Sequence, residues 1–174
     1  MSLLFWMAGK NNMPLLHLYV LLGFPCLSRF YRSVLEGQIR SRIIRYVTAV
    51  FLVFTVVNSL FVQQIFRFNS YALVLESMLI ILLSLYTFAF LLNNTASGIP
   101  IPDKSSISWI NSGLFIYHVS CLLIFYFGDT ILFCFPLALS RFTWAFHALF
   151  SIVMNSCFLV GLWKRSGMLH LSMH

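Results

Sequence analysis

Long apolar runs separated by short polar segments dominate the sequence. A membrane-spanning helix needs about 20 mostly apolar residues, and five stretches of this chain meet that requirement. The pattern predicts an all-α protein, an integral membrane helical bundle of five transmembrane helices that forms one domain over residues 1–174. The expected helices cover roughly residues 14–30, 43–63, 71–93, 108–127 and 141–163.

The connecting segments differ in chemistry. Residues 93–106 contain two prolines and a glycine, which predict a loop between the third and fourth helices. The stretch between the fourth and fifth helices contains Gly128, Asp129 and Pro136. Its apolar part, 131–139, is too short to span a bilayer, so we expect it to lie at the membrane interface or to dip back.

Basic residues are divided unevenly between the two ends of the expected helices. Eight would lie on the side of the first connector and three on the other: Arg29, Arg32, Arg40, Arg42, Arg45, Lys104, Lys164 and Arg165 against Lys10, Arg67 and Arg141. Lys and Arg are enriched on the cytoplasmic side of membrane proteins. The sequence therefore predicts an N-out, C-in orientation in a cell membrane, specifically a bacterial inner membrane.

Composition agrees with a membrane location. Apolar residue types make up 60% of the chain and charged types only 9%, whereas a soluble domain has about 25% charged residues. An ordinary soluble globule and a disordered chain are both excluded. The net charge of +7 is explained by orientation and by contacts with the lipid bilayer, so we expect no nucleic acid partner.

Several polar residues fall inside the apolar stretches, where such groups are functional candidates because they are costly in lipid. The candidates are His17, Asn58, Glu76, His118, His147 and Asn155. His17, Glu76 and His147 would lie at a similar depth, roughly 6–9 Å below the outer ends of their helices. Asn58 would lie near that level, and His118 near the middle. Residues 147, 151 and 155 share one helix face, which we expect to turn inward as part of a polar seam.

This seam allows two interpretations. It is either a hydrogen-bond network that holds the helices together or a site open to the outer face. In the second case His17, Glu76 and His147 could hold a divalent metal, bind a small polar ligand or pass a proton. No compact metal motif such as HExxH is present, so the sequence predicts no cofactor and leaves a metal as a weakly supported alternative.

A series of short motifs resembles a family of small bacterial multi-pass membrane proteins for which no activity is established. The motifs are HLYVLL (17–22), FNSYALVLES (68–77), SLY (84–86), WINSGLFIY (109–117), WAFH (144–147) with Asn155, and GLWK (161–164). Members of that family usually have seven helices. The resemblance implies that two helices are absent upstream, with residues 2–8 as the end of the second, and that the protein associates with sensor histidine kinase systems.

Residues of this chain that match positions of that family are His17, Glu76, Asn111, His147 and Asn155. Gly23 and residues 118–121 depart from its pattern. We expect a non-enzymatic accessory or sensory-input subunit that binds a small ligand or a partner helix. Another copy of the chain or a partner membrane protein would cover polar groups that absent helices leave open.

Two other functions remain open. One is a metal-dependent intramembrane hydrolase that uses His17, Glu76 and His147. The other is a transport or proton-relay subunit that works through the polar seam.

Overall fold

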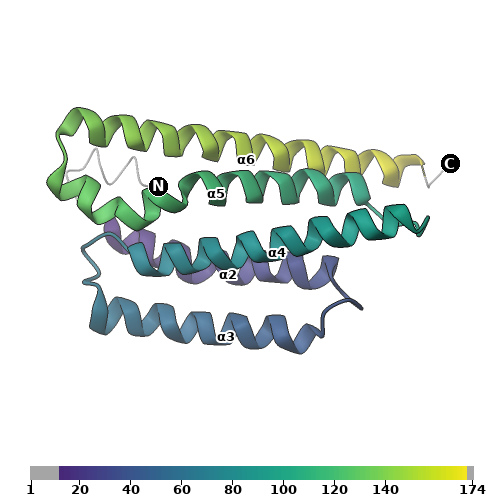
Figure 1. The fold of residues 1–174 in the computed structure, drawn as a ribbon, viewed down its shortest axis with the longest axis horizontal. Helices are drawn as coiled ribbons and strands as arrows, with labels where there is room; N and C mark the ends of the chain where they lie inside the picture. Colours follow the sequence, from purple (N-terminus) through teal and green to yellow (C-terminus); the bar gives the residue numbers. More distant parts are fainter. Residues whose placement is uncertain (1–11, 172–174) are drawn as a thin grey trace. The chain divides into compact units, whose positions relative to one another are not determined.

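The computed structural model describes the backbone of residues 12–171 and the side chains of residues 12–165. This part of the chain is helical and contains no strand, which confirms the all-α prediction. Its elements are α2 (Met13–Val34), α3 (Ser41–Val57), the π-helical turn η1 (Asn58–Val62), α4 (Ser70–Ala96), α5 (Lys104–Cys134) and α6 (Leu137–Leu171) (Figure 1). The expected helix end at residues 2–8 lies outside the described residues.

Five helices are long and apolar enough to cross a membrane, with η1 completing the span that α3 begins. The spans are Met13–Val34, Ser41–Val62, Ser70–Ala96, Lys104–Cys134 and Leu137–Arg165. Large apolar side chains are exposed along them, including Phe61, Leu92 and Leu159 at 80%, 70% and 70%. Extended exposed apolar surface of this kind marks a membrane or protein contact.

The fourth span is longer than the sequence predicted. The apolar residues 131–139 do not form a separate segment, because residues 131–134 complete α5 and residues 137–139 begin α6. Gly128 does not interrupt α5; its missing side chain accommodates the Phe68 ring, which a Cβ atom there would overlap. The interruption comes only at Pro136, which lacks an N–H group and disfavours the helical conformation for Phe135.

The chain divides into two compact units. Unit 1 comprises the chain up to Glu76 together with Leu123–Ser140. Within it, α2 and α3 form an antiparallel hairpin (Figure 1). Phe24 and Phe51 are buried between these helices, with their ring centroids 4.3 Å apart.

Unit 2 comprises Ser77–Leu122 and the chain from Arg141 onward. Two glycines allow α5 and α6 to approach closely within it. A Cβ atom on Gly113 of α5 would lie 2.7 Å from Cys157 Cβ, and one on Gly161 of α6 would lie 2.7 Å from Ile110 Cγ1. Small residues at such crossings are typical of helix packing in membranes, where close backbone approach supplies van der Waals contact.

Candidate functional site

A cluster of buried amide side chains lies in unit 1 where α3 ends. Asn58 follows Phe51 and Thr55 on the buried face of α3 and is 2% exposed, and the helix widens from Asn58 onward into the π-helical turn η1. Asn58 Nδ2 donates to Asn69 Oδ1 at 2.9 Å and to Gln63 Oε1 at 3.0 Å. Gln63 Oε1 also accepts from the backbone N–H of Tyr71 at 3.2 Å. The cluster therefore fixes the connector between η1 and α4, and π-helical turns occur frequently at functional sites.

His17 of α2 joins the same region. Its Nδ1 lies 2.7 Å from Ser59 Oγ, and its Nε2 lies 3.2 Å from the Arg67 carbonyl oxygen. A carbonyl oxygen can only accept, so Nε2 carries the hydrogen of this bond. In a neutral ring Nδ1 then accepts from the Ser59 hydroxyl group. His17 thus connects α2 with both η1 and the following connector.

A cavity of about 240 Å³ opens beside this histidine, between α2 and the end of α3. Its wall is mostly apolar and includes Leu21, Val56 and Leu60, with His17 and Ser59 among its polar groups. Small-molecule sites have apolar walls and a few convergent polar groups, with volumes of about 300–1,000 Å³, so this cavity is slightly smaller than that range. It suits a very small, largely apolar ligand with one polar group, or a side chain from another helix.

Glu76 of α4 is also in unit 1 and is only 3% exposed. Its carboxyl group lies against α2 at Gly23, where a Cβ atom would be 3.5 Å from Oε1. That separation is an ordinary van der Waals contact. A methyl group at Gly23 would therefore just contact the carboxyl group, and Glu76 is separate from the two hydrogen bonds that His17 makes.

In unit 2, three polar pairs connect the helices. His118 Nδ1 lies 3.1 Å from Ser77 Oγ, and His147 Nε2 lies 2.9 Å from the Tyr117 hydroxyl oxygen. Asn111 Nδ2 donates to the Ser84 carbonyl oxygen at 3.1 Å. Each pair connects two of α4, α5 and α6. Such bonds between membrane helices contribute about 0.6–2 kcal/mol each, so the pairs help to hold unit 2 together.

Asn155 does not turn inward as we expected. It is exposed, and its Nδ2 donates to the Ser151 carbonyl oxygen of its own helix at 2.7 Å. A short amide side chain can satisfy itself by bonding one helical turn back, so it needs no partner from another helix. The spacing of residues 147, 151 and 155 correctly indicates a shared face but does not determine which way that face points.

The sequence-predicted residues are distributed over both units. His17, Asn58 and Glu76 belong to unit 1, whereas His118 and His147 belong to unit 2. Among the described residues, no three His, Cys, Asp or Glu side chains gather so that they could hold a metal ion. The proposed metal site of His17, Glu76 and His147 therefore stays a prediction, without support from a cluster of metal-binding side chains among the described residues.

Sequence reasoning missed the residues that complete the site. Ser59, Gln63 and Asn69 bond directly to the predicted His17 and Asn58. The signal that could have revealed them is the amide- and hydroxyl-rich composition of residues 58–70, which contain two Asn, two Gln and two Ser between two strongly apolar stretches.

No protein-family model matches the chain, and no curated protein or solved structure matches it. The resemblance to the seven-helix bacterial family therefore stays an expectation. The function has to be argued from the chemistry of the described residues.

Proposed function

We propose that this chain is an integral protein of a bacterial inner membrane with five spans, oriented N-out and C-in. In this proposal it acts as an accessory or sensory-input subunit. The cavity beside His17 and Ser59 would bind a small ligand with an apolar body and one polar group, or an equivalent side chain of a partner helix. The observation that supports this proposal most directly is that the cavity combines a mostly apolar wall with a hydrogen-bonded histidine–serine pair.

The location of the cavity supports a role in sensing. The His17 ring is bonded to Ser59 in η1 and to the backbone of the connector at Arg67. A ligand that bonds to either member of the pair has to compete with one of these contacts. It would thereby favour one arrangement of α2 relative to the connector, to the extent that it binds that arrangement more tightly.

The alternatives have less support. An intramembrane hydrolase needs a metal site or another activated nucleophile, and the described residues contain no cluster of three metal-binding side chains. A transport subunit is typically built from repeated, broken helices around a site at the middle of the membrane, and the sequence contains no internal repeat. The polar pairs of unit 2 are of the kind that helix packing alone produces.

Photo-crosslinking at the cavity wall tests the proposal. A benzophenone amino acid is placed at Leu60, which lines the cavity, or at Phe61, which does not line it and is 80% exposed. The labelled protein is irradiated in native membranes, purified and measured by intact-mass spectrometry. We expect one discrete adduct from position 60 that is absent from position 61.

The adduct mass identifies the occupant as a small molecule or a polypeptide. The adduct should also decrease in a Ser59→Ala variant, because that variant removes the polar partner of His17 from the cavity. If position 60 yields only the mixture of bulk phospholipids that position 61 yields, the cavity has no specific occupant and the proposal is wrong.

A further inference from the structure

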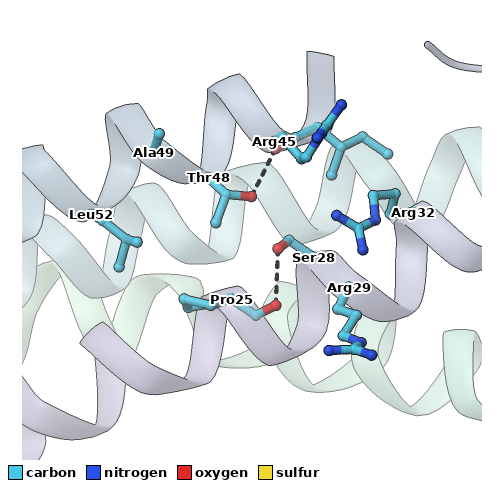
Figure 2. A pocket seen from close by; sticks show the side chains of 9 residues that line it. Pro25, Ser28, Arg29, Arg32, Arg45, Thr48, Ala49 and Leu52 are labelled. Carbon is cyan, nitrogen blue, oxygen red and sulfur yellow. Dashed lines mark hydrogen bonds between the residues drawn. The ribbon is translucent and has the colours of Figure 1, made fainter. Parts of the chain in front are cut away.

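A second cleft in unit 1 has a strongly basic character. It lies between α2 and α3 and has a volume of about 320 Å³ (Figure 2). Arg29, Arg32 and Arg45 line one end of it, with the Arg29 side chain extending away from the other two, and Pro25 and Leu52 lie toward the other end. Because α2 and α3 are antiparallel, the basic end is also the end nearest to the turn between them.

No ion pair among the side chains that the structure describes neutralises these arginines. The chain has only four acidic residues, and none of them lines the cleft. Asp129 is paired with Arg67 at 3.8 Å, and Asp103 is paired with Arg165 at 3.4 Å. Glu76 is buried elsewhere in the unit, and Glu36 forms no ion pair among the residues that the structure describes.

The start of α3 adds to the positive potential. This helix begins at Ser41 with Arg40 as its N-cap residue, no side-chain cap and no acidic residue in its first turn. A helix N-terminus has a partial positive charge that favours anions. The positive end of α3 and the neighbouring arginines therefore favour an anion, and no described acidic side chain forms an ion pair with them.

The two hydroxyl groups of the cleft already donate hydrogen bonds within their own helices. Ser28 Oγ donates to the Pro25 carbonyl oxygen at 3.0 Å, and Thr48 Oγ1 donates to the Ile44 carbonyl oxygen at 2.7 Å (Figure 2). The donors that remain for a ligand are the guanidinium groups. A guanidinium group offers paired N–H donors whose geometry matches the oxygens of a phosphate group.

We propose that this cleft binds a phosphate group, with the arginine end holding the phosphate oxygens and the apolar end holding an attached hydrocarbon. The distance along α2 from Pro25 to Arg32 is about 10 Å, which separates a charged end from an apolar end in the order found in an anionic phospholipid. The volume of about 320 Å³ lies within the usual range for small-molecule sites. A lipid source rests on the proposed membrane location, whereas a soluble phosphate source does not.

Binding measurements on the full chain in a neutral detergent test this inference. The probes are dioctanoyl phosphatidylglycerol, dioctanoyl phosphatidylcholine, glycerol 3-phosphate and inorganic phosphate, each titrated by calorimetry. The cleft variant is Arg32→Gln. The matched control is Arg42→Gln, which removes the same charge from the same basic segment but does not line the cleft. Circular dichroism and gel filtration establish that both variants are folded.

We expect the anionic lipid to bind and the zwitterionic lipid to bind much more weakly. Arg32→Gln should lower the affinity for the anionic lipid about five- to tenfold, and Arg42→Gln should leave this affinity nearly unchanged. Ala49→Phe supplies a second test, since Ala49 lines the cleft and a larger side chain there would obstruct the hydrocarbon. Ala49→Phe should lower the affinity for the lipid but not the affinity for inorganic phosphate.

Tight binding of glycerol 3-phosphate or inorganic phosphate that is lost in Arg32→Gln would keep the phosphate site and assign it a soluble ligand. Equal losses in Arg32→Gln and Arg42→Gln would show diffuse attraction to surface charge, which overturns the proposal. Absence of binding by every anionic probe would overturn it as well.

Discussion

Replacing Gly113 with alanine should destabilise the protein, although alanine is the better helix former. A Cβ atom at this position of α5 would lie 2.7 Å from Cys157 Cβ and 3.1 Å from the Met154 carbonyl oxygen of α6. Both of these atoms are fixed to the α6 backbone, so no side-chain rotation can relieve the overlap. The two helices have to move apart.

The magnitude follows from two opposing effects. Alanine stabilises a helix by about 1 kcal/mol relative to glycine. Overpacking of a well-packed interface costs about 1–3 kcal/mol, and backbone-fixed neighbours place Gly113→Ala toward the upper end of that range. We therefore expect a net loss of about 1–2 kcal/mol in the free energy of unfolding.

Two other glycines provide matched comparisons. A Cβ at Gly161 would lie 2.7 Å from Ile110 Cγ1 and 3.1 Å from the Ser106 carbonyl oxygen. Only the second of these atoms is fixed to the backbone, so Gly161→Ala should cost less than Gly113→Ala. The nearest atom to a Cβ at Gly23 is Glu76 Oε1 at 3.5 Å, an ordinary contact. Gly23→Ala should therefore be neutral or stabilising by up to about 1 kcal/mol.

Reversible unfolding in mixed dodecyl maltoside and dodecyl sulfate micelles, followed by circular dichroism, measures these differences. The order of stability should be Gly23→Ala, wild type, Gly161→Ala and Gly113→Ala, from most to least stable. A Gly113→Ala variant as stable as Gly23→Ala would refute the close approach of α5 and α6 at this position.

Three further substitutions can be measured in the same micelle assay. Asn58→Leu should destabilise the protein by about 1–3 kcal/mol, because it leaves Asn69 Oδ1 without its donor and Gln63 Oε1 with only the Tyr71 N–H. Asn155→Leu should have little effect because that residue is exposed; equal effects would contradict the buried cluster. Tyr117→Phe should lower the free energy of unfolding by about 0.6–1.7 kcal/mol, because it removes the hydrogen bond to His147. An unchanged stability would argue against that bond. Arg67→Gln should change stability by less than about 1 kcal/mol, because its ion pair is long and exposed; a larger loss would show that Arg67 contributes more than an exposed ion pair does.

The sequence predicted the number and the approximate location of the long helices, because an apolar run of about 20 residues has a single stable solution in a bilayer. It predicted helix ends less well. Gly128 and Asp129 resemble a turn in sequence, yet α5 continues through them to Cys134 because the glycine makes room for Phe68. Such accommodation depends on a residue far away in the chain, which no local pattern contains.

The candidate site was predicted only in part. His17 and Asn58 were singled out because polar groups in apolar stretches are costly. Their partners were missed because Ser59, Gln63 and Asn69 lie in the π-helical turn and in the connector that follows it, and nothing in the local sequence predicts a change from an α-helical to a π-helical turn. Asn69 was assigned to a connector, where a buried amide is not expected.

Accessibility of single cysteines in intact cells tests the central claim, five spans with the N-out, C-in orientation, most directly. The four native cysteines are replaced by alanine, and one cysteine is introduced in place of Arg40, Arg67 or Lys164. Each variant is treated with a membrane-impermeant maleimide before and after lysis. We expect position 67 to be labelled in intact cells, and positions 40 and 164 only after lysis. Labelling of position 40 in intact cells, with position 67 protected, would contradict the orientation and place the cavity beside His17 at the cytoplasmic side.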